Sequence, residues 1–362
     1  MKKTKLYEIH KSLGANMINF AGFKMPISYG SIINEHKSVR NNVGIFDISH
    51  MGQFLVEGKN AEDFLQYCCS NDVKKIFIGR AQYNYLPNLN GGIIDDLIVY
   101  KIEKEKFLLV VNASNIQKDW EHLKLLNKEF NADLKNISDN VSLLSIQGPN
   151  SIKLLSKISD FNFGTLKNYM NCITNVAGVK EVIVASTGYT GAGGYEIYCN
   201  NENVRQIWDT LLNEGKELSV LPIGLGARDS LRLEMGYCLY GNELNEQTTP
   251  IEAGLSWITK HETCFIGSNS IQDNLPSKKL IALISEERAI PRSGYKIFSK
   301  EKKEVGLVTS GGMSPCLKKG IALAYVDYEM RLEKEFLIGI RDNFFIFEKT
   351  KLPFYKNGTY LK

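Results

Sequence analysis

Two adjacent acidic residues, Asp95 and Asp96, lie in GGIIDDLIVY, an otherwise apolar and β-branched run that predicts a buried strand. Successive side chains of a strand point to opposite faces, so the two carboxylates cannot form a facing acid pair within this segment. An ionised carboxylate removed from water is costly unless it is paired or hydrogen-bonded. We therefore expect at least one of them to meet a cation, a donor cluster or a ligand. Capping of a turn and a wet sheet edge are the structural alternative.

A predicted helix in GLGARDSLRLEMG carries two arginines on one face, because Arg228 and Arg232 are four residues apart. Two neighbouring cations without partners would repel each other by about a few tenths of a kcal/mol, so an anion is expected nearby. The candidates are Glu196, Glu234, one of the two aspartates and a carboxylate of the substrate. Surface salt bridges to Asp229 and Glu234 are an alternative of equal weight.

The glycine-rich stretch STGYTGAGGYEIY ends in a predicted strand that carries Glu196. Its glycines do not have the GxGxxG spacing between a strand and a helix that binds a dinucleotide. We interpret the stretch as a tight turn that lets a ligand approach the backbone. Glu196 would then face that ligand, or else pack in the interior.

Several common kinds of catalytic centre find no support in the sequence. The five histidines show no metal-ligand spacing, and the seven cysteines include no CxxC pair. Neither a GxSxG elbow nor a phosphate-binding loop ending in GK[ST] occurs. We expect no metal and no bound nucleotide. His50, in FDISHMGQF, is interpreted as a structural hydrogen-bond donor near the site.

The composition is that of an ordinary globular protein, with 43% hydrophobic and 23% charged residues among 362. The 44 Lys and Arg against 40 Asp and Glu give a net charge of +4, which is too even for a nucleic-acid-binding protein. No stretch approaches the roughly eighteen apolar residues that would span a bilayer. We expect a cytoplasmic protein that binds neither nucleic acid nor a membrane, and the scattered cysteines fit a reducing compartment.

These residues together describe one kind of site: carboxylates and an arginine among aromatic side chains, namely Tyr83, Tyr189, Tyr240 and Trp257. Such a site suits an aromatic heterocycle that is rich in N–H donors. Catalysis would come from placing reactants and stabilising positive charge rather than from covalent attack.

The elements that must position this site change in kind along the chain. Residues 1–274 alternate strand-like and helix-like segments, including a helix predicted from an N-cap at Ser31 to Gly44, and they form two interleaved α+β units that divide near residue 140. Residues 275–362 contain short strands with frequent turns, which predicts a small β-barrel. The fold class is therefore α+β with a C-terminal barrel.

The order of the motifs resembles the aminomethyltransferase family of the glycine cleavage system, the T proteins, across essentially the whole chain. The matching stretches are NFAGFKMPISYG, EHKSVRNNVGIFDISHMGQF, GGIIDDLIVY, VNASN, QGPNS, STGYTGAGGYEIY, PIGLGARDSLRLEMGYCLYGNEL and TSGGMSPCL. The resemblance implies a three-domain cloverleaf around a central opening for tetrahydrofolate. It also implies the reaction, in which an aminomethyl group on the lipoyl arm of H protein passes its carbon to tetrahydrofolate, giving 5,10-methylenetetrahydrofolate, ammonia and dihydrolipoyl H protein.

The resemblance also assigns residues. Asp95 matches the catalytic position, where a carboxylate lies by the folate nitrogens, and Asp96 is expected to find a structural partner on the other side of the sheet. Glu196 and Arg228 match folate-binding positions; a carboxylate fits the paired N–H donors of a 2-aminopyrimidinone. The further folate-pocket positions are Tyr83, Asn112, Tyr189, Tyr240, Met51 and Trp257.

A few positions depart from the family pattern. Ala192 and Gly193 follow TGYTG, where an acidic residue is usual, so the contacts of this loop with folate are expected to differ. SGG at 310–312 replaces the commoner SGT, and Phe23 stands where tryptophan is frequent.

Two other families of this fold are alternatives. The non-enzymatic folate-binding iron–sulfur maintenance factors resemble KGCYxGQE at their signature, whereas this chain has GYCLYGNEL, without the lysine and with a shifted cysteine. The flavin demethylases would need a GxGxxG domain, and none is present in the sequence. The aminomethyltransferase interpretation is preferred.

Overall fold

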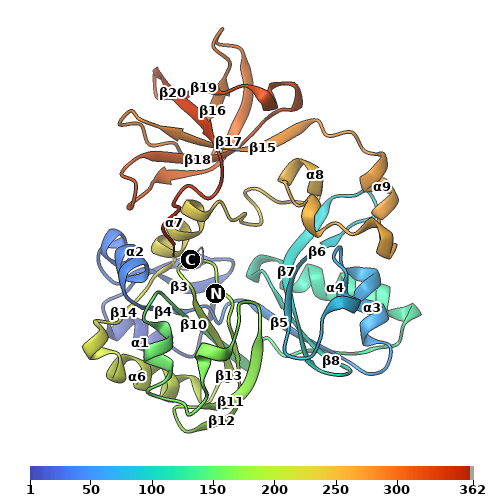
Figure 1. Cartoon of the computed structure of the whole chain (residues 1–362), viewed down its shortest axis with the longest axis vertical. Coiled ribbons are helices and arrows are strands. Elements are labelled where there is room, and N and C mark those ends of the chain that lie inside the picture. Colours follow the sequence, from blue (N-terminus) through green and yellow to red (C-terminus); the bar gives the residue numbers. More distant parts are fainter. Residues whose placement is uncertain (359–362) are drawn as a thin grey trace.

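The computed structural model describes residues 1–358, which form three lobes (Figure 1). The first lobe is built on a six-stranded sheet in the order β11-β12-β13-β10-β4-β14. Its strands are β4 (Gly44–Asp47), β10 (Val141–Gln147), β11 (Asn171–Val176), β12 (Val179–Ala185), β13 (Gly194–Asn200) and β14 (Leu221–Pro222). A small sheet in the order β1-β3-β2 adds β1 (Lys2–Lys3), β2 (Asn16–Phe20) and β3 (Phe23–Ser28).

The helices of the first lobe cover the sheet with apolar faces. They are α1 (Tyr7–Ser12), α2 (Ile32–Asn41), α5 (Ser151–Leu155), α6 (Val204–Glu214) and α7 (Leu225–Met235). In α6, Ile207, Trp208 and Leu211 are fully buried in the core that also holds Leu144 and Ile146 of β10. This spacing of buried residues along α6 is that of one helical face.

The start of α2 is as predicted, but its end is not. The Ser31 hydroxyl accepts a hydrogen bond from the Asn34 N–H at 3.4 Å, as an N-cap does. The helix ends at Asn41, and Gly44 instead begins β4. A Cβ at Gly44 would lie 2.4 Å from the Ile223 side chain, so the glycine is required by close packing rather than by a helix C-terminus.

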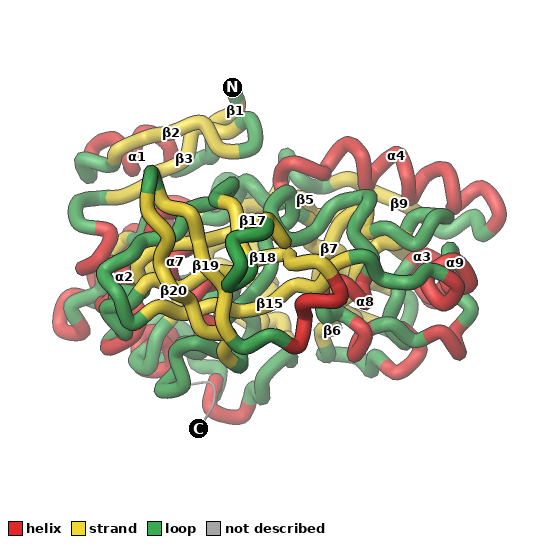
Figure 2. The backbone as a smooth tube through the Cα atoms, turned by 90° about the horizontal axis from the view of Figure 1, so that it is seen from above, coloured by secondary structure: helices red, strands yellow, loops and turns green. Residues whose placement is uncertain are grey.

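The second lobe is built on a five-stranded antiparallel sheet in the order β6-β7-β8-β5-β9. Its strands are β5 (Gly52–Glu57), β6 (Ala81–Pro87), β7 (Ile93–Glu103), β8 (Lys106–Val111) and β9 (Asp133–Asn136). The helices are α3 (Ala61–Cys68), α4 (Ile116–Leu126), α8 (Pro250–Ala253) and α9 (Ser268–Asp273). In the view from above, α4 lies along the outer edge of this lobe (Figure 2).

The third lobe is a closed barrel in the order β15-β18-β17-β16-β19-β20. Its strands are β15 (Lys278–Ser285), β16 (Lys296–Phe298), β17 (Glu304–Met313), β18 (Gly320–Asp327), β19 (Glu335–Ile340) and β20 (Asn343–Thr350). The predicted α+β class with a C-terminal barrel is confirmed. The boundary expected at residue 275 lies in the connection between α9 and β15.

The first lobe is made from two separate parts of the chain. β4 pairs antiparallel with β10 and parallel with β14, so the N-terminal segment shares a sheet with residues from 141 onward. The second lobe is inserted between these parts, and the last strand before residue 140 is β9 of that lobe. Among residues 1–358, no helix is long and apolar enough to cross a membrane.

Candidate functional site

A cavity of about 1720 Å³ is lined by residues from all three lobes. The second lobe contributes β6 and β7, and the first contributes the turn before β13 and Arg228 of α7. The barrel contributes β15 and the end of β20. The volume exceeds the roughly 300–1,000 Å³ of most small-molecule pockets, so a large ligand or two reactants can enter together.

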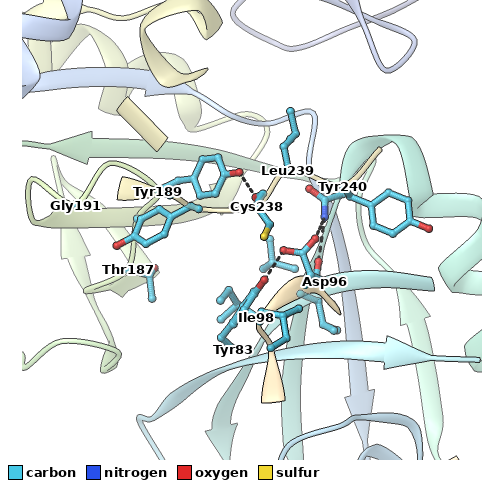
Figure 3. A pocket seen from close by; sticks show the side chains of 18 of the residues that line it. Tyr83, Asp96, Ile98, Thr187, Tyr189, Gly191, Cys238, Leu239 and Tyr240 are labelled. Carbon is cyan, nitrogen blue, oxygen red and sulfur yellow. Dashed lines mark hydrogen bonds between the residues drawn. The ribbon is translucent and has the colours of Figure 1, made fainter. Parts of the chain in front are cut away.

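Eight of the nine predicted site residues line this cavity; these are Met51, Tyr83, Asn112, Tyr189, Glu196, Arg228, Tyr240 and Trp257. Figure 3 shows Tyr83, Tyr189 and Tyr240 from separate elements around one space. Trp257, in the short 3₁₀ helix Ser256–Ile258, is 62% exposed and stacks on Tyr83 with 6.1 Å between the ring centroids. The two rings form an aromatic wall that extends from the cavity toward its rim.

The orientation expected for the two aspartates is wrong. Asp96 lines the cavity, whereas Asp95 is fully buried and is not part of the cavity wall. The alternation along β7 explains this, because Ile98 and Tyr100 share the cavity face with Asp96. Asp95 belongs to the opposite face with Val99, which is fully buried in the core under α3 and α4 and is not part of the cavity wall.

Asp96 has neutral hydrogen-bond donors around it. The Tyr83 hydroxyl donates to Oδ2 at 2.9 Å (Figure 3). The Asn112 side-chain amide donates to Oδ1 at 2.8 Å. Burial, followed by the charge of Asp95, raises the pKa of Asp96 to about 7. At neutral pH this carboxyl can therefore both take and give a proton.

Asn112 connects the two aspartates. It directly follows β8, whose pairing with β7 reaches only to Ile98 on that strand. Its backbone N–H donates to Asp95 Oδ2 at 2.9 Å, and its side-chain amide donates to Asp95 Oδ1 at 2.9 Å as well as to Asp96. The position of the Asp96 carboxylate thus depends on a residue that Asp95 anchors.

Glu196 is held by one of its two carboxylate oxygens. Oε2 accepts hydrogen bonds from the hydroxyls of Thr187 at 2.6 Å, Tyr100 at 3.4 Å and Tyr198 at 3.5 Å. Within residues 1–358, no donor bonds to Oε1. Glu196 lies on β13 in the cavity wall, so it can offer one acceptor oxygen to a ligand.

Arg228 is a partly buried cation that forms no salt bridge with another of residues 1–358. Its guanidinium lies 4.7 Å from the centroid of the Tyr189 ring, and burial lowers its pKa. The guanidinium makes neither a hydrogen bond nor a salt bridge with another of residues 1–358. The Tyr189 hydroxyl beside it donates to the Cys238 carbonyl, which fixes the ring on which Arg228 rests (Figure 3).

The neighbouring arginine behaves differently. Arg232 forms ion pairs with Asp229 at 2.8 Å and with Glu243 at 3.1 Å, and both its side chain and that of Glu243 are buried. The salt-bridge alternative holds for Arg232 with Asp229, but Glu234 pairs with Arg40 instead. Arg228 alone of the two arginines retains free donors, and it faces the cavity.

Several wall residues besides Asp96 were not among the predicted folate-pocket positions, although His50 was expected near the site. His50 lines the cavity, and burial, followed by the charge of Arg228, lowers its pKa to about 3, so its ring is neutral. Its expected role as a structural donor is not visible at Nδ1, which has no partner among the described residues. Tyr100 and Tyr237 are further wall residues. Tyr100 could have been found from its spacing with Asp96, since both have even positions along one strand.

The glycine-rich turn has the predicted character. Gly191, Gly193 and Gly194 line the cavity, and all three have positive φ. A Cβ at Gly194 would lie 2.2 Å from the Ile146 carbonyl oxygen, so this position requires glycine. Ala192, which replaces the usual acidic residue, is buried in the core between the two α+β lobes and is not part of the cavity wall.

A second buried carboxylate cluster lies outside the cavity wall, and we call it the Glu234 network. It consists of Glu234 with Arg40, His36, Ser314 and Cys316. Ligand atoms of His36, Glu234 and Cys316 lie within 4.8 Å of one another, which is close enough for a metal ion. The Arg40 guanidinium already occupies Glu234 with hydrogen bonds of 3.0 and 2.9 Å, and its charge would repel a metal cation.

The chain is similar to known proteins over nearly its whole length. The family model described as GCVT N-terminal domain matches residues 6–263, and the one described as Glycine cleavage T-protein C-terminal barrel domain matches residues 278–356. An aminomethyltransferase of Flavobacterium psychrophilum is 46% identical over 360 residues, which cover 98% of this chain and 100% of that protein. An aminomethyltransferase of Halothermothrix orenii is 46% identical over 359 residues, with the same coverage.

A solved structure agrees with these sequence matches. The crystal structure of the glycine cleavage system aminomethyltransferase T from Bartonella henselae has a TM-score of 0.92 to this fold and 33% sequence identity. The match covers 99% of each chain, so it includes all three lobes.

Proposed function

Since the chain belongs to the glycine cleavage T-protein family and acts as an aminomethyltransferase of that system, we propose that its central cavity binds tetrahydrofolate beside Asp96. The observation that carries this proposal is the convergence on one cavity of a carboxyl with a pKa of about 7, an open carboxylate oxygen and an unpartnered guanidinium. The iron–sulfur maintenance alternative is set aside, because the full-length relatives are aminomethyltransferases.

The proposed reaction moves one carbon and two protons. The carbon of the aminomethyl group leaves the lipoyl sulfur and the amine, and it joins two nitrogens of tetrahydrofolate. Each of these nitrogens loses one hydrogen; one proton ends on the released ammonia and the other on the lipoyl thiol. A group that exchanges protons near neutral pH can serve both transfers.

Asp96 is the residue proposed for this role, in place of Asp95. The cavity wall contains two acidic side chains, Asp96 and Glu196. Of these, Asp96 has the pKa near neutrality, and its remaining negative charge would stabilise an iminium that develops on the one-carbon unit. Asp95 would act through Asn112, which it anchors.

Glu196 and Arg228 are proposed to orient the folate ring. The free Oε1 of Glu196 can accept a hydrogen bond from an N–H group of a 2-aminopyrimidinone. The unpartnered guanidinium of Arg228 can donate to a carbonyl or carboxylate oxygen of the same ligand. The residues proposed to enclose the ring are Tyr83, Asn112, Tyr189, Tyr240, Met51 and Trp257.

The proposed partner is the lipoylated H protein, whose arm would deliver the aminomethyl group into the cavity. Its support is the family membership and the cationic side chains of the cavity wall, which suit an acidic partner or the carboxylates of folate. Besides Arg228, these side chains are Lys75, Arg80, Lys279, Arg331, Lys349 and Lys351. The expected cytoplasmic location is part of the same proposal, and the seven free thiols agree with a reducing compartment.

The test is a single-turnover assay with H protein that carries an aminomethyl-lipoyl group. With this protein and tetrahydrofolate, ammonia and 5,10-methylenetetrahydrofolate should appear in equal amounts, faster than with either component alone. The matched control replaces aminomethylated H protein by the dihydrolipoyl form. Ammonia release at only the uncatalysed rate in the complete mixture would contradict the proposed function.

A further inference from the structure

Asp119 is a buried acid that no step of the proposed reaction uses. It lies in the first turn of α4, its side chain is fully buried, and neither carboxylate oxygen has a hydrogen-bond donor among residues 1–358. It lies within hydrogen-bonding reach of Asp95 on β7, which is itself fully buried. Two carboxyl groups therefore meet in a dry place behind the cavity wall.

Two ionised carboxylates cannot share such a place, because neither can donate a hydrogen bond and their charges repel. Burial and the charge of Asp95 raise the pKa of Asp119 to about 11. The helix N-terminus favours a negative charge at Asp119, but this effect is small compared with the desolvation of a buried carboxylate. One of the two acids must remain protonated, and its proton can then bond to the other.

No surrounding cation among residues 1–358 is placed to neutralise a second carboxylate of this pair, so the pair keeps its proton. Lys118, next to Asp119, donates to the Tyr240 hydroxyl at 2.8 Å and to Glu246 at 3.2 Å, so its charge is directed to another acid. Asp96 and Asp95 are the other ionisable groups that raise the pKa of Asp119, while Lys118 lowers it.

Asp95 is by contrast well supplied with donors. The Asn112 backbone N–H and side-chain amide each donate at 2.9 Å, and the Asn115 amide donates at 2.5 Å. The negative charge of the pair is therefore more stable on Asp95, and the proton is more stable on Asp119. A hydrogen bond from the Asp119 hydroxyl would complete the ring of donors around the Asp95 carboxylate.

We propose that Asp119 is a positioning residue for the transfer reaction: it shares one proton with Asp95, and the pair anchors Asn112 and thereby fixes the place and the charge environment of Asp96. The geometry forms one chain from α4 through Asp95 and Asn112 to the cavity. The pair as a whole carries a single negative charge beside Asp96. This inference rests on the proposed role of Asp96 as the acid–base group.

The first test compares two variants. D119L removes the donor while keeping the branched shape of the side chain, and it should lower kcat at least tenfold while the KM for tetrahydrofolate changes less than twofold. D119N keeps a neutral donor, so it should recover most of the lost kcat and leave the acid limb of the pH–rate profile where it is in the wild type. A D119N profile whose acid limb moves to lower pH would mean that a negative charge was removed, and it would overturn the shared proton. A folded D119N with the same loss of kcat as D119L would overturn the positioning role.

The second test needs no activity and stays decisive if D119L does not fold. Infrared spectra of the wild-type protein at pH 8 should contain the carbonyl stretch of a protonated carboxylic acid that is absent from D119N. Absence of that band from the wild type would overturn the shared proton. If wild-type protein gives the band but no folate-dependent ammonia release, the shared proton stands and only the proposed function fails.

Discussion

Two carboxylate clusters in this molecule differ in the groups that surround the carboxylate. The Glu234 network contains Arg40, whereas the Asp96 cluster, which we define as Asp95, Asp96, Asp119, Asn112 and Tyr83, contains neutral donors and no lysine or arginine. The pKa values of the two carboxyl groups are therefore shifted in opposite directions. Burial raises the pKa of Glu234, but the hydrogen bond and charge of His36 and then the charge of Arg40 outweigh it and lower this pKa to about 2. Burial, followed by the charge of Asp95, raises the pKa of Asp96 to about 7.

The Glu234 network connects the first lobe to the barrel. Glu234 on α7 accepts from Arg40 and His36 of α2, and from the Ser314 hydroxyl and the Cys316 N–H, which follow β17 of the barrel. A carboxylate with these partners stays charged over the physiological pH range, so it holds structure and cannot exchange protons. The Asp96 cluster lacks that cation, and its proton can therefore take part in chemistry.

The comparison is tested most strongly by D96N. This variant should fold and bind tetrahydrofolate but lose about 10²–10⁴-fold in the rate of methylenetetrahydrofolate formation, the usual contribution of a general acid–base group. Single-turnover rates with aminomethylated H protein measure the loss. D63N is the matched control, because Asp63 is exposed on α3 and pairs with Lys74.

The same assay separates the two adjacent aspartates. D95N should reduce the rate less than D96N, because Asp95 acts through Asn112 rather than on the reacting atoms. If D95N were the slower of two equally folded variants, the assignment of the acid–base role to Asp96 would be wrong.

Loss of the cation from the Glu234 network should lower the stability of the protein. R40M removes the cation and leaves Glu234 buried, so the free energy of unfolding should fall by about 3–5 kcal/mol, as when other buried ion pairs lose one partner. Urea unfolding at pH 7 measures the change. R205M serves as control, since Arg205 is exposed and its pair with Asp209 is worth about 0.5 kcal/mol or less. Equal stability of R40M and R205M would show that the Glu234 network does not stabilise the contact between the lobes.

Arg228 should show the reverse pattern from Arg40. R228M removes a cation that has no anionic partner among residues 1–358, so the free energy of unfolding should not fall. Its affinity for tetrahydrofolate should drop about 10–100-fold, which corresponds to one hydrogen bond of a charged donor at about 1.5–3 kcal/mol. Fluorescence titration gives the affinity and urea unfolding the stability. Unchanged affinity, or a stability loss like that of R40M, would show that Arg228 is structural.

The sequence predicted the fold and most of the cavity for physical reasons. Alternation and helix caps identified the α+β lobes and the barrel. Arg228 was singled out because two arginines on one helix face need an anion nearby, and Glu196 because it follows the glycine-rich turn, while their assignment to folate came from the family resemblance. The order of Asp95 and Asp96 was missed because it depends on which face of β7 meets the core. The alternation of β7 does not show that face, because Ile94, Ile98 and Tyr100 in the row of Asp96 are as apolar as Leu97 and Val99 in the row of Asp95. Asp119 could not be found, since its neighbour Asp95 is brought to it by tertiary packing alone.

The smallest predicted effect is a difference in how the two clusters respond to pH. The folded pKa of Glu234, about 2, lies below its ordinary value of 4.5, so its stabilisation is complete above pH 4.5 and is lost as the pH falls toward 2. The folded pKa of Asp96, about 7, lies above its ordinary 3.8, so ionisation of this group disfavours the folded state increasingly as the pH rises from about 4 through 7. D96N should therefore gain stability over the wild type between pH 4 and pH 8, by about 1–2 kcal/mol, less than the full shift would give because Asp96 is partly exposed to the cavity. Urea unfolding of both proteins at pH 4, 6 and 8 measures the difference, and a gap that does not widen with pH would mean that Asp96 has an ordinary pKa and that the two clusters do not differ as described.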